Sequence, residues 1–177
     1  MRDSKPPTFA NSRQFGEEEK EMNCCGKSSV VETQQVGANR GCQLCGGPSR
    51  PVTLRTMLLM LKPEFFDQVG ENQYRFCASP ECPVVYFSRE RSFSTGDLRV
   101  RVGLKEKDGP IPLCYCFGFS EEAAREEIQT KGHTTIPQRI AALIRERMCA
   151  CEERNPSGAC CLGEVTQAMK RLMKEAK

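Results

Sequence analysis

Twelve cysteines in a chain of 177 residues constrain this sequence more than any other feature. Such a density is typical of either a disulfide framework or a set of metal sites. The first thirty residues are polar and charged and contain no apolar core of a secretion signal, so we expect a cytoplasmic protein. Because disulfides are rare in the reducing cytosol, the cysteines predict metal ligation.

Four of the cysteines fall within residues 149–161, around an Asn-Pro-Ser-Gly turn. One apolar stripe at helical spacing precedes this loop and another follows it. A thiol-rich loop between two helices favours a metal centre. The stripes consist of Ile136, Ile140, Leu143, Ile144 and Met148 before the loop, and of Val165, Met169, Leu172 and Met173 after it.

Two further cysteine pairs predict a zinc site. Cys42 and Cys45 form a C-x-x-C pair followed by glycines, the usual shape of a zinc knuckle. Cys77 and Cys82 form a C-x4-C pair inside residues 74–87, whose aromatic and β-branched residues predict a strand, a turn and a strand. Two such thiol turns, with 31 residues between them, indicate one tetrahedral four-thiolate site. A closed site of this kind holds a structural zinc and has no open position for catalysis.

The remaining periodicity predicts several short elements. We expect a helix over residues 53–61 and, from the alternation of apolar and polar residues, a half-buried strand over residues 98–102. Ser120 is expected to cap a helix over residues 120–130. Thr135, followed three positions later by Gln138, fits a capping box at the start of the helix that leads to the thiol loop.

These patterns predict an α+β fold in which a small zinc-stapled, β-rich subdomain precedes a helical subdomain. We place the first over residues 41–110 and the second over residues 111–177. Residues 1–40 are polar and lack apolar periodicity, so they are expected to form a disordered tail. Cys24 and Cys25 lie in this tail as spare thiols or, alternatively, as a site for Cu(I), because thiolates suit that soft ion.

Six cysteines of the ordered part remain once the zinc site is assigned. Two irons bridged by two sulfides need four thiolates, and a C-x-C pair can place two of them on one iron. The last of the six lies where the final helix begins, and the N–H groups and dipole of a helix N-terminus stabilise negative charge. The six are Cys114, Cys116, Cys149, Cys151, Cys160 and Cys161.

The order of these thiols resembles a known family. The pattern consists of Cys114-Tyr-Cys116-Phe-Gly, two predicted helices, and then the motifs Cys-x-Cys-Glu, Asn-Pro-Ser-Gly and Cys-Cys-Leu-Gly. It is similar to the [2Fe-2S] module of bacterioferritin-associated ferredoxin (BFD). More closely, it resembles the N-terminal region of CopZ-type copper chaperones, which pairs a zinc-binding subdomain with a BFD-like [2Fe-2S] subdomain. The resemblance covers about residues 41–177 and includes the Cys-Pro-Val-Val-Tyr-Phe strand after the zinc turn.

The resemblance implies which thiols hold the cluster. It implies a C-x-C pair, one cysteine from the loop and one cysteine just before the last helix. Carried over to this sequence, the ligands are Cys114, Cys116, Cys151 and Cys161, with Cys149 and Cys160 as alternates.

A function follows from the resemblance. It implies one-electron transfer linked to copper handling, either by reducing Cu(II) to Cu(I) or by supporting a copper chaperone. The expected partner is a redox protein or a copper-handling protein. CopZ-type chaperones also carry a C-terminal heavy-metal-associated copper domain with an M-x-C-x-x-C motif, which we do not find before Lys177, so direct copper delivery is not expected. The alternatives are a thiol-rich protein that binds, senses or stores metal without electron transfer, with Cu(I) as a ligand, and a zinc-stapled interaction module.

Other classes of function are not expected. The net charge of the chain is only +3, and its Lys and Arg residues are interspersed with Glu and do not form a basic cluster. Nucleic acid is therefore not an expected partner. The longest apolar run, residues 57–61, is far too short to span a membrane. His133 is the single histidine and lies in no Ser-His or Cys-His arrangement, so we do not expect an enzyme.

Overall fold

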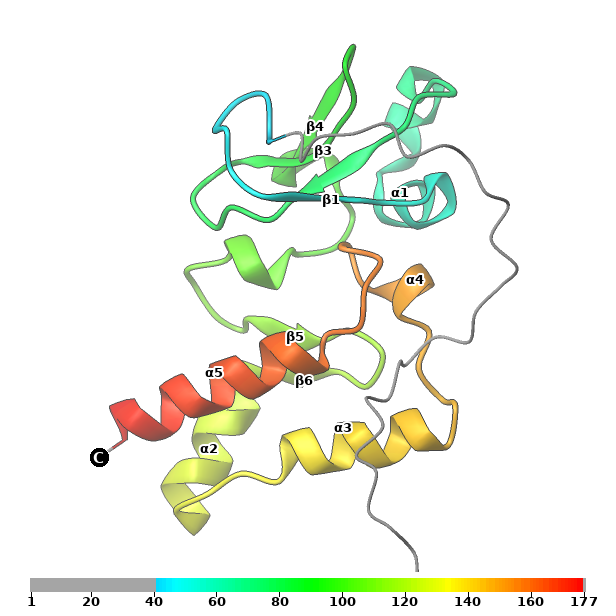
Figure 1. The fold of residues 1–177 in the computed structure, drawn as a ribbon. Coiled ribbons are helices and arrows are strands. Elements are labelled where there is room, and N and C mark those ends of the chain that lie inside the picture. Colours follow the sequence, from blue (N-terminus) through cyan, green and yellow to red (C-terminus); the bar gives the residue numbers. More distant parts are fainter. Residues whose placement is uncertain (1–40, 177) are drawn as a thin grey trace, which may run out of the picture.

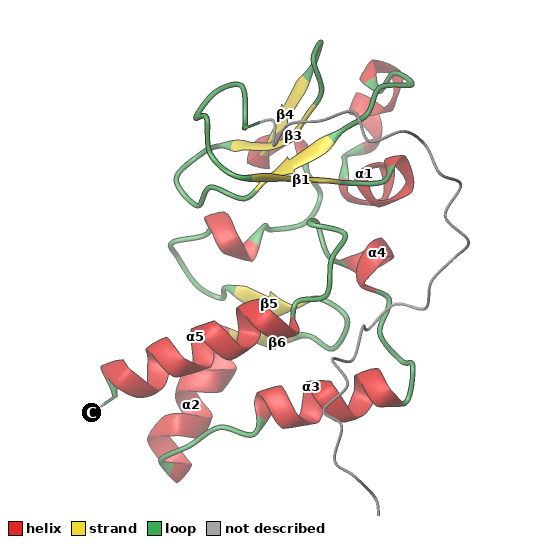
Figure 2. Cartoon of the chain, viewed as in Figure 1, coloured by secondary structure: helices red, strands yellow, loops and turns green. Residues whose placement is uncertain are grey.

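A computed structural model describes residues 41–176, which form two parts stacked on each other (Figure 1). A four-stranded sheet with helix α1 makes one part. The hairpin β5–β6 with helices α2, α3 and α5 makes the other (Figure 2). The tail expected over residues 1–40, with Cys24 and Cys25, lies outside the described residues.

The sheet of the first part is antiparallel throughout, in the order β1-β2-β3-β4. The predicted strand, turn and strand over residues 74–87 are confirmed, because β2 pairs with β3. All four side chains of β3 are buried, as its run of apolar and aromatic residues requires. The strands are β1 (Ser49–Pro51), β2 (Arg75–Cys77), β3 (Val84–Phe87) and β4 (Ser92–Ser94).

The helix predicted over residues 53–61 is confirmed as α1 (Leu54–Met60). It begins at Thr53, whose hydroxyl oxygen accepts a hydrogen bond from the backbone N–H of Thr56 at 3.1 Å. Its buried face packs into an apolar core with the aromatic side chains of the sheet. That core comprises Met57, Met60, Leu61, Tyr74, Phe76, Val85, Tyr86, Phe93, Leu98 and Val102.

The strand predicted over residues 98–102 is wrong. Only an isolated bridge between Leu61 and Leu98 forms there. The guanidinium group of Arg99 instead donates to the carbonyl oxygens of Leu58 and Leu59 at the end of α1. These carbonyls have no partner within the helix, so an arginine that caps them competes with regular strand pairing. Three 3₁₀ turns complete this part: η1 (Pro63–Gln68), η2 (Thr95–Asp97) and η3 (Gly103–Lys105).

The second part packs helices around a small hairpin. Ser120 caps α2 as predicted, with its hydroxyl oxygen accepting from the backbone N–H of Ala123 at 3.3 Å. The apolar core of the second part contains Ile128, Ile136, Ile140 and Val165, together with the thiols of Cys114 and Cys161. The elements are β5 (Pro112–Cys114), β6 (Phe119–Ser120), α2 (Glu121–Lys131), α3 (Ile136–Arg145), α4 (Cys151–Arg154) and α5 (Leu162–Glu175).

The capping box predicted for α3 is wrong, because the side chain of Thr135 makes no cap hydrogen bond. The carboxylate of Glu127 on α2 organises this turn instead. It accepts hydrogen bonds from the Thr134 hydroxyl at 2.9 Å and from the backbone N–H of Thr135 at 3.2 Å, and it pairs with Arg139 at 2.9 Å. A carboxylate from the preceding helix therefore accepts the hydrogen bonds of donor groups in the turn before α3.

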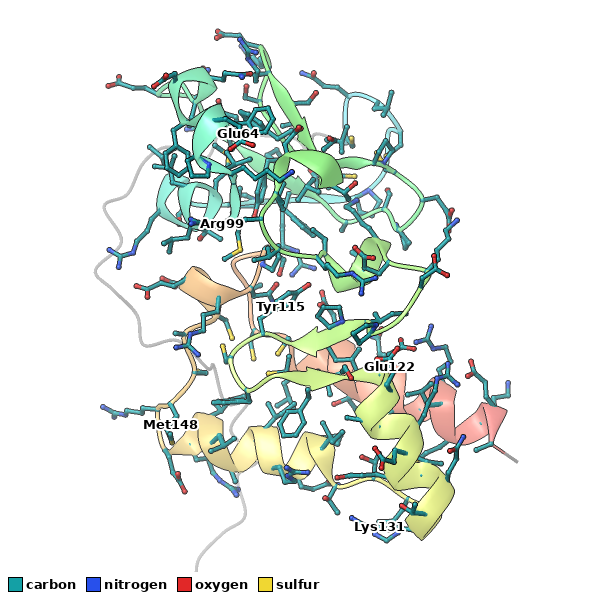
Figure 3. All side chains as sticks on the ribbon, turned by 180° about the vertical axis from the view of Figure 1, so that it is seen from behind. Glu64, Arg99, Tyr115, Glu122, Lys131 and Met148 are labelled. Atoms are coloured by element: carbon teal, nitrogen blue, oxygen red, sulfur yellow. The ribbon has the colours of Figure 1, made fainter. Side chains whose placement is uncertain are left out.

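Helix α3 ends at Arg145, earlier than its apolar stripe suggests. Arg147 adopts a left-handed backbone conformation with φ of 58°, which turns the chain away from the helix axis. Met148 is therefore 60 % exposed at the outer edge of the molecule (Figure 3), and the prediction that it belongs to the core is wrong. Met173 near the end of α5 is also partly exposed. Among the described helices, none is long and apolar enough to cross a bilayer.

Candidate metal centres

The four cysteines assigned to zinc converge in the first part. Their sulfur atoms all lie within 4.8 Å of one another. Cys42 and Cys82 approach to 3.9 Å, and Cys45 and Cys77 approach to 3.8 Å. Three of these thiols are buried and that of Cys45 is exposed. Four thiols at such spacing match the tetrahedral coordination of a structural zinc ion.

The knuckle at residues 42–47 closes through its own backbone. The N–H of Cys42 donates to the carbonyl oxygen of Gly47 at 3.0 Å, and the N–H of Gly46 donates to the carbonyl oxygen of Cys42 at 2.7 Å. Gly46 has φ of 68°, a conformation that residues with a Cβ adopt rarely. The N–H of Gly47 then points at the sulfur of Cys45 at 3.4 Å, which suits a thiolate.

The surroundings of these thiols favour a bound cation. Hydrogen bonding, chiefly with the Ser79 hydroxyl, lowers the pKa of Cys45 to about 6. Burial raises the pKa of Cys82 to about 12 and also raises the pKa of Cys77. Buried thiolates therefore form here only with a compensating positive charge, and a coordinated Zn²⁺ supplies it.

The six remaining cysteines of the described residues lie in the β5–β6 hairpin, at the start of α4 and just before α5. The sulfurs of Cys116 and Cys151 are 3.7 Å apart. The thiol of Cys161 is close enough to the thiols of Cys114 and Cys151 for the three groups to shift one another's proton affinities. Sulfur atoms gather below Tyr115 in Figure 3, beside the hairpin of the second part. The structure thus brings together the four thiols that the resemblance implied as cluster ligands.

Different elements place these four thiols. Cys114 is the last residue of β5, and Cys116 follows in the hairpin turn. Cys151 is the first residue of α4, and Cys161 is the N-cap of α5. Helix α4 was not predicted from the sequence, and it is short enough to escape any periodicity.

The Asn-Pro-Ser-Gly turn folds the chain back between Cys151 and Cys161. The side-chain amide of Asn155 donates to the carbonyl oxygen of Ala159 at 2.7 Å, and its oxygen accepts from the backbone N–H of Ser157 at 3.0 Å. Both Asn155 and Ser157 are buried. The loop is therefore held by its own hydrogen bonds, as Asn and Ser side chains commonly do in turns.

Close packing of these thiols shifts their proton affinities in opposite directions. Hydrogen bonding with Cys161 lowers the pKa of Cys151 to about 5 and that of Cys114 to about 7. Burial raises the pKa of Cys116 to about 12, and the pKa of Cys161 is raised by its hydrogen bonds with Cys114 and Cys151. All four thiols can ionise together only beside a cation, which is what metal ligation provides.

The alternates occupy less central positions. Cys149 and Cys160 are half-buried, whereas Cys114, Cys151 and Cys161 are almost completely buried. The thiol of Cys160 lies near that of Cys151. Within residues 41–176, the zinc cysteines are the one group with three or more ligand atoms inside 4.8 Å, so the thiols of the second centre are more widely spread.

Comparison with known proteins identifies the first part. Residues 39–99 match the family model of a zinc binding domain of the CopZ type. This chain carries a CopZ-type zinc-binding domain. All four converging cysteines lie inside the matched segment.

The resemblance to CopZ extends beyond that segment. The copper chaperone CopZ of Archaeoglobus fulgidus is 34 % identical over 91 residues, which are 51 % of this chain and 43 % of that protein. The X-ray structure of the A. fulgidus CopZ N-terminal domain covers 72 % of this chain and 95 % of its own, with a TM-score of 0.61 and 27 % identity. The predicted order of a β-rich part and a helical part is thereby confirmed as the fold of the CopZ N-terminal domain. The sequence match spans less than half of the chaperone's length.

Some residues around both centres had no signal in the sequence. The ammonium group of Lys105 donates to the carbonyl oxygens of Ser79 and Cys82 in the zinc turn. The guanidinium group of Arg154 donates to the carbonyl oxygen of Cys116 at 3.1 Å. Ser79 could have been suspected from its place between two zinc cysteines, whereas Lys105 and Arg154 lie far along the chain from the groups they bind.

Proposed function

We propose that this chain is a one-electron transfer protein that holds a [2Fe-2S] cluster on Cys114, Cys116, Cys151 and Cys161, beside its zinc domain. The observation that carries the proposal is the convergence of these four thiols from a hairpin, a short helix and a helix N-terminus. When bound, such a cluster accepts and releases single electrons.

The residues of the second centre fit this cluster. Its thiols follow one another from Cys116 through Cys151 and Cys161 to Cys114. They are more widely spread than those of the zinc site, which suits two irons bridged by sulfides better than a single ion. Cys114 and Cys161 belong to an apolar core that excludes water. The backbone N–H of Ala150 donates to the sulfur of Cys116 at 3.3 Å, and such a hydrogen bond stabilises a thiolate ligand.

Similarity to CopZ suggests what the electron serves. Because a curated relative is a copper chaperone, we propose a copper-handling partner for this protein. The protein would deliver electrons that convert Cu(II) to Cu(I), the form that soft thiolate sites bind. Cys116 is the most exposed of the four proposed ligands, so its side of the centre is the natural path for the electron.

The decisive experiment is anaerobic purification with iron, sulfide, zinc and copper measured on one sample. We expect iron and sulfide in equal amounts, two of each per chain, with one zinc, and an EPR signal that appears after reduction with dithionite. A colourless protein with zinc in both centres and no sulfide would contradict electron transfer. That result would favour the alternative of a thiol-rich metal-binding or storage protein.

A further inference from the structure

The loop that joins α4 to α5 rests on the zinc-binding part, although it belongs to the second part (Figure 1). The hydroxyl of Tyr86 on β3 donates to the carbonyl oxygen of Pro156 at 2.7 Å. The hydroxyl of Thr56 on α1 donates to the carbonyl oxygen of Glu152 at 2.6 Å. Two donors from the zinc-binding part therefore hold the segment that carries the last two proposed cluster ligands.

The contact between Tyr86 and Pro156 is shut off from water. The side chains of both residues are fully buried, and so is that of Thr56. Water cannot replace a hydrogen bond lost at such a position, because the carbonyl group would remain without a partner. Pro156 also lies midway between Cys151 and Cys161, so its displacement moves both thiols.

A second tyrosine makes the reciprocal contact. Tyr115 lies between Cys114 and Cys116, and its side chain reaches the junction of the two parts (Figure 3). Its hydroxyl donates to the carbonyl oxygen of Arg101 at 3.1 Å and accepts from the backbone N–H of Gly103 at 2.7 Å. Each half of the second thiol centre is thus fastened to the zinc-binding part by one tyrosine.

Resting on the proposed function, we propose that Tyr86 is a positioning residue for the cluster: its hydroxyl, through Pro156, sets where Cys151 and Cys161 stand relative to Cys114 and Cys116. The Tyr86 hydroxyl binds the backbone of the loop and not a thiol. It acts through the loop, as residues around a metal site act by orienting its ligands. The zinc-binding part is then the frame on which the redox centre is aligned.

The test compares Tyr86→Phe with Tyr74→Phe in the full-length protein. Tyr74 is buried in the same core, but its hydroxyl accepts from the backbone N–H of Gly70 at 3.3 Å and not from the loop. We expect both variants to retain one zinc per chain. Only Tyr86→Phe should shift the midpoint potential and the EPR spectrum, and it should lose iron to a chelator about tenfold faster.

Two outcomes would overturn the inference. The first is a Tyr86→Phe protein whose potential, spectrum and rate of iron loss equal those of Tyr74→Phe. If the wild-type protein assembles no cluster, the proposed function fails, and the inference is judged on the zinc-loaded protein by the alkylation rates of Cys151 and Cys161. Equal rates in the two tyrosine variants would then overturn it, and faster alkylation in Tyr86→Phe would support it.

A second pair of variants keeps the inference testable if Tyr86→Phe loses zinc. Thr56→Val removes the hydroxyl that binds Glu152, and Thr56→Ser retains one. We expect the potential to shift in the valine variant and to stay at the wild-type value in the serine variant. Identical potentials in both would contradict a positioning role for the zinc-binding part.

Discussion

The ammonium group of Lys105 donates a hydrogen bond to the carbonyl oxygen of Cys82 at 2.9 Å, and a second to that of Ser79 at 2.8 Å. Lys105 ends the 3₁₀ turn η3, whose first residue, Gly103, donates its N–H to the hydroxyl of Tyr115 in the β5–β6 hairpin. One short turn therefore contacts both the zinc turn and the second thiol centre. Burial raises the pKa of the Cys77 thiol, and the positive charge of Lys105 partly offsets this by lowering it.

Replacing Lys105 with Met should weaken zinc binding. The variant loses two hydrogen bonds to the zinc turn and the cation that stabilises the nearby thiolates, so zinc should be released to a chromogenic chelator about tenfold faster. Lys107→Met is the matched control, because Lys107 pairs with Glu81 at the surface and both side chains are largely exposed. Equal release rates in the two variants would show that Lys105 has no part in holding the zinc.

Cys161→Ser should prevent assembly of the proposed [2Fe-2S] cluster and leave the zinc in place. Its thiol is buried between those of Cys114 and Cys151, so an uncharged hydroxyl there cannot serve as the fourth thiolate. Cys160→Ser should retain iron and sulfide at the wild-type level. Metal analysis and the visible spectrum measure both variants, and iron lost only from Cys160→Ser would reassign the ligand.

Gly103→Ala should destabilise the junction between the two parts. A Cβ at this position would stand 1.9 Å from the carbonyl oxygen of Pro112, so the backbone must shift. We expect a loss of about 1–3 kcal/mol in the free energy of unfolding, the usual effect of overpacking. Gly163→Ala is the control: its Cβ would meet nothing within 4 Å, and helix propensity should stabilise the protein by up to about 1 kcal/mol. Chemical denaturation measures both, and equal changes would contradict the clash.

Glu127→Gln should destabilise the protein in a pH-dependent way. Hydrogen bonding, chiefly with the Thr134 hydroxyl, lowers the pKa of Glu127 in the folded state. The carboxylate therefore stabilises the fold above its unfolded pKa of about 4.3, and this contribution disappears as the pH falls through the folded pKa. We expect about 1 kcal/mol of destabilisation at pH 7, shrinking in more acidic solution.

The control for this pH dependence is Glu126→Gln, because Glu126 is an exposed neighbour on the same helix. Unfolding of each variant and of the wild type is measured over the same pH series, so any loss of metal in acid affects all three alike. A difference between Glu127→Gln and wild type that does not change with pH would contradict the role of the carboxylate.

Local sequence patterns were sufficient for much of this structure. Ser120 is the N-cap of α2, as its side chain predicted, and the helix predicted over residues 53–61 forms as α1. The alternation over residues 98–102 identified Leu98 and Val102 as buried side chains, although no strand forms. That error and the missing Thr135 cap share one cause. In each case a side chain makes a contact between separate elements in place of the local pattern: Arg99 binds carbonyl oxygens of α1, and Glu127 of α2 accepts from the backbone N–H of Thr135.

The sequence by itself determined the four thiols of the first centre and the order of the two parts, because cysteine spacing, turn residues and apolar periodicity are local properties. For the second centre it supplied six candidate thiols, and the choice of four among them came from the family resemblance. Only the tertiary structure decided how the sets are completed and joined. Tyr86 and Pro156 are 70 positions apart, and Thr56 and Glu152 are 96 apart. No local sequence pattern in either segment predicts these contacts. Such contacts depend on how the parts pack, since a buried hydroxyl must find whichever carbonyl group the packing brings within reach.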